Sequence, residues 1–150
     1  MSGPRAIRPT LAGYGVPRDS EGMVSWEWAR ERLAGAHNYW VATSGPHASP
    51  VWAVWLDGGL VFSCGAASRK ARAVARDPHV VVHLESGAEV VIVEGEAAVL
   101  EPSAELLEEY ARKYGPVNAD AGNWYRVHPH RALAWLESDY PRSATRFDFD

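Results

Sequence analysis

Residues 49–95 read SPVWAVWLDGGLVFSCGAASRKARAVARDPHVVVHLESGAEVVIVEG. Two apolar runs flank the dipeptide Asp57-Gly58, which is typical of a tight hairpin turn. A short basic segment, residues 68–72, follows the second run, and two further runs rich in valine come after it. Because β-branched residues favour strands, this stretch predicts a strand, a hairpin turn, a strand, a short basic helix and two more strands.

The basic segment begins with Ser68, Arg69 and Lys70 and opens a predicted helix, Ser68–Arg76, which ends before Asp77-Pro78. Backbone N–H groups at a helix start and two cationic side chains can converge on one anion, and a phosphate suits that combination. A solvated helix face with an N-cap serine produces the same local pattern. The segment alone therefore leaves both interpretations open.

The rest of the chain extends a pattern of short strands. The predicted strands are Asn38–Thr43, Ser49–Leu56, Leu60–Cys64, Val80–Leu84, Glu89–Leu100, Tyr125–Leu136 and Ala144–Phe149. The predicted helices are Trp26–Ala34, Ser68–Arg76 and Pro102–Tyr114. Gly95, inside a long strand, predicts a bulge or bend. The pattern predicts a mainly β (α+β) fold, an antiparallel barrel with two or three peripheral helices.

The composition fits one soluble domain. We expect residues 24–150 to form it, and residues 1–23, rich in Gly and Pro, to form an irregular N-terminal arm. A net charge of −4 argues against a nucleic-acid partner. The single cysteine, together with the lack of a signal peptide or an apolar membrane-spanning segment, predicts a cytoplasmic protein with no membrane partner.

Several other residue types could contribute to a site. A flat apolar wall beside a phosphate anchor suits a flavin-like cofactor, and five tryptophans could supply the wall, although core packing explains most of them. These are Trp40, Trp52, Trp55, Trp124 and Trp135. Cys64 fits a small buried thiol better than a nucleophile. The histidines lack the ligand spacing of a metal site, so none is expected, while a haem contact through one histidine stays open.

Segments in a fixed order carry a resemblance to a known family. They are Gly59–Gly65, Ser68–Arg72, Arg76–His79, Val80–Leu84, Val91–Gly95, Val127–Trp135 and Ala144–Phe149. Their order and spacing resemble the pyridoxamine phosphate oxidase-like superfamily of flavin- and deazaflavin-binding split barrels, in particular its actinobacterial branch. The resemblance covers roughly Val24–Phe149 and implies an antiparallel split barrel that forms a homodimer, with two cofactor sites at the subunit interface.

The resemblance also implies where a cofactor phosphate binds. Ser68, Arg69 and Lys70 match the family's phosphate-binding segment. Ser63 and Cys64 match a pair at the end of the third strand that contacts the phosphate or the ribityl chain. On this basis we expect these five residues to bind the cofactor.

The same resemblance implies a ring-binding region. Val51, Trp52 and Ala53 match the stretch that runs beneath the isoalloxazine ring, and Val90 falls where the oxidase places a glutamine from the other subunit. Arg146 could approach the cofactor or substrate from the partner chain, with a structural salt bridge as the alternative. Because Val90 replaces the glutamine and the second strand lacks the oxidase's arginine, pyridoxamine phosphate oxidation itself is not expected.

The implied function is a flavin- or deazaflavin-dependent oxidoreductase that transfers hydride to or from a small molecule. The implied cofactor is the deazaflavin coenzyme or FMN, with FAD less favoured, and no catalytic residue can be assigned. The deazaflavin coenzyme carries an anionic polyglutamate tail, which Arg72, Arg76, Arg5 and Arg8 could bind. Two alternatives stay open: a non-catalytic flavin, haem or tetrapyrrole binder, and a structural dimer with a vestigial site.

Overall fold

The computed structural model describes residues 3–120 and 122–150. Its strands are β1 (Arg5–Ile7), β2 (Tyr39–Thr43), β3 (His47–Val51), β4 (Ala53–Leu56), β5 (Gly59–Cys64), β6 (His79–Leu84), β7 (Glu89–Leu100), β8 (Asn123–Leu136) and β9 (Thr145–Asp148). Its helices are α1 (Trp26–Gly35), α2 (Arg69–Arg76), α3 (Ala104–Tyr114), the 3-10 turn η1 (Glu137–Asp139) and α4 (Tyr140–Ser143). The strand pairs are antiparallel, which confirms the predicted α+β class.

The strands form a barrel that is open along one seam. The order β3-β2-β6-β7-β8 continues through β5 to β4, because the first part of β8 pairs with β5. The later part of β8 pairs with β9 and extends the sheet beyond the barrel. Although β3 and β4 follow each other in the chain, β3 pairs with β2 and β4 pairs with β5. The barrel is therefore split between β3 and β4.

The seam corrects one predicted element. Ser49–Leu56 was expected to be a single strand, but the chain leaves the sheet at Trp52, between β3 and β4. Val51 and Ala53, on either side of this break, are both buried in the main core, whereas Val54 is buried in a second cluster beneath α3. The break lets the chain pass from one strand partner to the other.

Gly95 marks the predicted irregularity in β7. The register between β7 and β8 shifts between Glu94 and Gly95, which confirms a bulge. A side chain at this position would collide with the backbone of His128 on β8. The glycine therefore permits a close approach of two backbones where the long strands bend.

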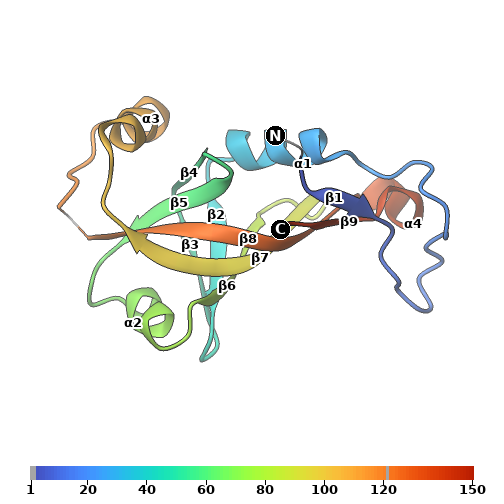
Figure 1. Cartoon of the computed structure of the whole chain (residues 1–150), viewed down its shortest axis with the longest axis horizontal. Coiled ribbons are helices and arrows are strands. Elements are labelled where there is room, and N and C mark those ends of the chain that lie inside the picture. Colours follow the sequence, from blue (N-terminus) through green and yellow to red (C-terminus); the bar gives the residue numbers. More distant parts are fainter. Residues whose placement is uncertain (1–2, 121) are drawn as a thin grey trace.

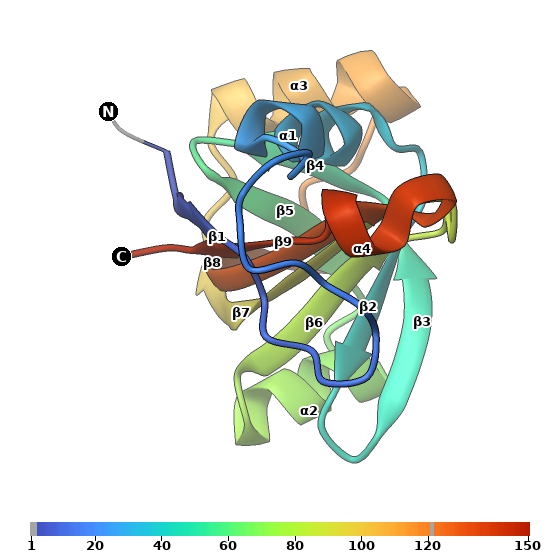
Figure 2. The same cartoon turned by 90° about the vertical axis from the view of Figure 1, so that its right-hand side faces the viewer.

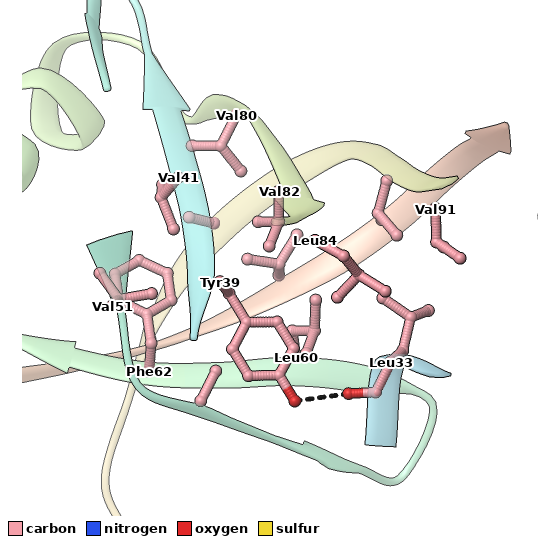
Figure 3. Packing of buried hydrophobic residues seen from close by; sticks show 14 of the residues in the cluster. Leu33, Tyr39, Val41, Val51, Leu60, Phe62, Val80, Val82, Leu84 and Val91 are labelled. Carbon is pink, nitrogen blue, oxygen red and sulfur yellow. Dashed lines mark hydrogen bonds between the residues drawn. The ribbon is translucent and has the colours of Figure 1, made fainter. Parts of the chain in front are cut away.

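The core fills the barrel interior. Alternate residues of β2, β6 and β7 point inward, as the buried positions of β2 show: Tyr39, Val41 and Thr43. Figure 3 shows these strands directing Tyr39, Val41, Val80 and Val82 toward one another, with the Tyr39 hydroxyl donating to the Leu33 carbonyl of α1. A smaller cluster lies under α3 and contains Val54, Val61, Leu106, Tyr110 and Trp124.

The helices cover the barrel from two sides. In Figures 1 and 2, α1 and α3 lie on one side and α2 on the other. Ser25, Ser68 and Ser103 cap α1, α2 and α3 through their side-chain oxygens. The described residues contain a fourth helix, α4, where two or three helices were expected. No helix in this part of the chain is long and apolar enough to cross a membrane.

The N-terminal segment is more ordered than predicted. Residues 1–23 were expected to be irregular, and Met1 and Ser2 lie outside the described residues. Arg5–Ile7, however, forms β1 and pairs with β9. The Arg8 guanidinium then donates hydrogen bonds to the carbonyl oxygens of five residues: Asp19, Glu21, Pro141, Arg142 and Ala144. These tertiary contacts order the segment despite its high content of Gly and Pro.

Candidate functional site

A cationic pocket lies between α2 and the turn that joins β2 to β3. It has a volume of about 420 Å³, and Arg69, Arg72 and Arg76 line it together with His47. The three arginines recur at helical spacing and so share one face of α2. No carboxylate lines the pocket, and among the described residues these arginines form no ion pair. Such a pocket is complementary to an anion.

The start of α2 supplies further donors. The Ser68 side chain accepts a 3.2 Å hydrogen bond from the Ala71 N–H, as an N-cap does. The backbone N–H groups of Arg69 and Lys70, in the first turn, have no intrahelical acceptor and are available to an anion. Lys70 Nζ donates to Ser49 Oγ at 2.8 Å, which links α2 to β3. The structure thus brings the predicted phosphate-binding segment against the β2–β3 hairpin.

The pKa of His47 depends on the positive charges of this region. Its pKa is lowered from the ordinary value, first by desolvation and then by the positive charges of Arg69 and Lys70. A histidine here therefore resists protonation until a negative charge offsets its neighbours. The shift places His47 within the electrostatic reach of both cations.

Ser63 and Cys64 end β5, one short loop before α2. Both are partly buried, and they pair with Trp124 and Asn123 of β8. The loop is closed by a hydrogen bond from Ser68 N–H to the Gly65 carbonyl. The two residues therefore lie at the approach to the start of α2, and their contact with a cofactor stays a prediction.

The stretch from Val51 to Ala53 borders the seam. Val51 and Ala53 are buried in the core, so only their backbone can face a ligand. Trp52 is 46% exposed, and its ring stacks on Tyr114 of α3 with centroids 4.7 Å apart. This part of the predicted site thus lies against α3, and α2 reaches the same hairpin farther along, at Ser49.

A half-buried lysine fixes α3 to this stretch. Lys113 Nζ donates to the Ala53 carbonyl at 2.9 Å and to the Tyr39 hydroxyl at 2.7 Å. Tyr114 accepts a 3.0 Å hydrogen bond from the Ala53 N–H. Burial lowers the pKa of Lys113 to about 8 and raises that of Tyr39. The Ala53 backbone is therefore held by α3.

Val90 and Arg146 lie apart from α2 within one chain. Val90 pairs with Trp135, and Arg146 pairs with Leu133, on the outward-facing surface of the sheet. Arg146 also makes two hydrogen bonds to Asp148, at 2.8 and 3.0 Å, which lower the pKa of that carboxyl. The salt bridge named as the alternative for Arg146 is thus present. Neither residue lines the pocket of Arg69.

Two groups of residues show the limits of sequence reasoning at this site. Arg5 pairs with Asp148 and Arg8 binds backbone carbonyls, so of the four candidate tail-binding arginines only Arg72 and Arg76 line the pocket.

Sequence reasoning missed His47, Ser49, Lys113 and Tyr114. Their sequence context carries no motif, because long-range pairing and α3 bring them to the site.

Fold and pocket together define a class: an antiparallel split barrel with a cationic pocket at a helix start, which fits a phosphate-bearing cofactor. A family model described as pyridoxamine 5'-phosphate oxidase matches residues 26–140. The chain belongs to this family. A comparison with curated protein sequences finds no match.

Solved structures share the fold at low sequence identity. A conserved hypothetical protein, Rv2991 from Mycobacterium tuberculosis, is 22% identical with a TM-score of 0.66, covering 79% of this chain and 88% of that one. An F420 reductase is 19% identical with a TM-score of 0.56, covering 68% and 94%. An FAD binding protein from Mycobacterium smegmatis is 18% identical with a TM-score of 0.57, covering 85% and 98%. These likenesses establish a common fold.

Proposed function

We propose that this protein is an oxidoreductase that binds a phosphate-bearing tricyclic cofactor, the deazaflavin coenzyme or FMN, at the pocket of α2. The observation that carries the proposal is the group of Arg69, Arg72 and Arg76 in one pocket without a lining carboxylate. Structural neighbours named as an F420 reductase and an FAD binding protein support a cofactor of this type.

The residues of the chain would hold the cofactor at two ends. Arg69, Lys70 and the first-turn N–H groups of α2 would bind the phosphate, because cationic forks and helix starts both favour it. β3 pairs only with β2 among the described strands, so one of its edges carries unpaired backbone groups. That edge, near Val51 and Trp52, would orient the ring. When bound, the cofactor supplies the hydride chemistry, and the protein positions its ring and limits water access.

Within this proposal, the deazaflavin coenzyme is favoured over FMN. One phosphate would need only part of the cationic set, since Arg69, Lys70 and the helix start would supply its donors. Arg72 and Arg76 extend the same face of α2 by two further turns. A longer anionic group, such as a chain of carboxylates, matches this extended set of charges better than a single phosphate does.

A second copy of the chain would complete the site. The outward face of β2, β6 and β7 is apolar and partly exposed, and carries Trp40, Ala42, Val81, His83, Val90 and Ile92. The Trp40 and His83 rings stack there, with centroids 6.5 Å apart and planes 4° from parallel. Because an apolar sheet face of this kind favours association, we expect a homodimer through this face. Val90 would then approach the partner's cofactor.

A cofactor titration tests the proposal. Ligand-stripped protein is titrated with FMN and with the deazaflavin coenzyme, and tryptophan quenching is recorded. The proposal expects saturable binding of at least one of them, followed by reduction of the bound cofactor with a hydride donor and its reoxidation with a hydride acceptor. Binding of neither overturns it, and a Soret band on addition of haem would instead support a haem-binding protein. Binding without redox turnover would support a carrier.

A further inference from the structure

A second cleft is lined by residues of the N-terminal arm, β8 and α4. The arm and α4 lie at the end of the molecule opposite α2 and α3 (Figure 1). Its volume is about 530 Å³, within the roughly 300–1,000 Å³ typical of small-molecule sites. Three aromatic side chains line it: Trp135 of β8, Tyr140 of α4 and Tyr14 of the arm. The pocket of Arg69 shares none of these residues, so the two sites are separate.

The three lining rings lie at steep angles to one another. Trp135 and Tyr140 have centroids 5.3 Å apart with planes at 87°, and Tyr14 and Tyr140 have centroids 6.1 Å apart with planes at 71°. Rings at such angles form the walls of a box rather than a flat stack. An aromatic box is the arrangement that binds alkylated ammonium groups through cation–π attraction.

The charge of the cleft selects the same class of ligand. Glu137 is its charged lining residue, and no Lys, Arg or His lines it. In the described part of the chain, Glu137 forms no ion pair. A carboxylate without a protein cation beside three aromatic rings is complementary to a positively charged ligand with an apolar body.

The N-terminal arm is tied at its base and carries Tyr14 at its tip. Arg8 binds carbonyls of Asp19 and Glu21 as well as those of α4, so both ends of the loop between them are tied to one helix. At the tip, Tyr14 is 64% exposed and lies between Gly13 and Gly15, whose φ angles are +83° and +71°. This is a compact surface loop with a closed base, and its tyrosine lines the outer side of the cleft.

From these observations we infer that the arm cleft is a binding site for a small organic ammonium ion, a site distinct from the proposed cofactor pocket. The rings of Tyr14, Trp135 and Tyr140 would surround the ammonium group, and Glu137 would balance its charge. Leu11 and Leu133 would contact the apolar body of the ligand.

Choline and its uncharged carbon isostere, 3,3-dimethyl-1-butanol, provide the test. Both are titrated into the full-length protein by calorimetry, at moderate salt. The inference expects choline to bind at least tenfold more tightly than the isostere, because the two differ mainly in charge. Equal binding of both, or no binding of choline, overturns it.

Matched variants locate the site. Glu137→Gln should weaken choline binding about tenfold, whereas Glu105→Gln, an exposed acid on α3, should leave it unchanged. Tyr14→Leu should weaken it about fivefold and Tyr14→Phe, which keeps the ring, less than twofold. Unchanged choline binding in both Glu137→Gln and Tyr14→Leu would place the ligand elsewhere and refute the inference. FMN and deazaflavin titrations of the same variants should match the wild type, which separates this result from that of the cofactor proposal.

Discussion

Lys70 Nζ and Ser49 Oγ are joined by a hydrogen bond of 2.8 Å that links helix α2 to strand β3. The contact connects the two parts of the proposed cofactor site, because Lys70 belongs to the phosphate-binding segment and Ser49 precedes the seam at Trp52. Lys70 forms no ion pair within the described part of the chain, so its ammonium keeps donors available to an anion. The relation between these residues leads to the first prediction.

Replacing Lys70 with methionine should weaken FMN binding by roughly 10- to 100-fold. A hydrogen bond to a charged group contributes roughly 1.5–3 kcal/mol, and methionine keeps the length of the side chain without the charge. Ser49→Ala, which removes only the acceptor of the resting contact, should change the affinity by less than about threefold. Fluorescence titration measures both. A folded Lys70→Met protein with wild-type affinity would remove Lys70 from the site.

Arg72 and Arg76 should distinguish the two candidate cofactors. Charge removal in the variants Arg72→Gln and Arg76→Gln should weaken deazaflavin binding about tenfold each and FMN binding less than about twofold, since only the former cofactor has additional anionic groups. Arg30→Gln, on the exposed face of α1, is the matched control. Equal losses for both cofactors would mean that these arginines bind the phosphate itself.

His47 should titrate differently in free and bound protein. In the free protein its pKa lies below the ordinary 6.5, because of desolvation and the charges of Arg69 and Lys70. An anion in the pocket offsets those charges and stabilises the imidazolium, so the pKa should rise when FMN binds. NMR of the imidazole protons measures it, with His47→Gln to assign the signal. A pKa that stays constant or falls on binding would place the anion away from this pocket.

Gly95→Ala should lower the free energy of unfolding by roughly 1–3 kcal/mol, the usual cost of overpacking. The added methyl group would meet the His128 backbone, which cannot yield as a side-chain tip can. Gly87→Ala is the matched control, because an added Cβ there meets open space. Urea denaturation of both variants gives the comparison. Equal stability of the two would show that β7 and β8 separate at the bulge without cost.

Local signals predicted the elements of this fold well. The Asp57-Gly58 turn has φ angles of +52° and +78°, as a tight hairpin requires. Ser25 and Ser68 cap their helices, a role that depends on neighbouring backbone alone. Gly95 lies at the bulge, where a glycine inside a long strand is a local signal for such an irregularity. The residues at positions 69 and 70 were assigned by resemblance and lie together at the start of α2.

The break at Trp52 could not be read from the sequence, because it depends on which strands flank β3 and β4. The alternating residues on both sides look like one strand.

The burial of Trp124 and Tyr125 also depends on tertiary contacts. Adjacent residues of a strand point to opposite faces, so strand periodicity alone predicts that one of the two rings is exposed. Both rings are nevertheless buried, Tyr125 in the main core and Trp124 in the cluster under α3. The barrel interior and α3 cover the two faces of β8 at this point.

A crystal structure of the protein with bound FMN or deazaflavin coenzyme tests the central claim most directly. The proposal predicts the cofactor phosphate within hydrogen-bond distance of Arg69 and the first-turn N–H groups of α2, with the ring along the edge of β3 beside Trp52. A phosphate bound away from α2, with Arg69 and Lys70 in the same positions as without cofactor, would contradict it.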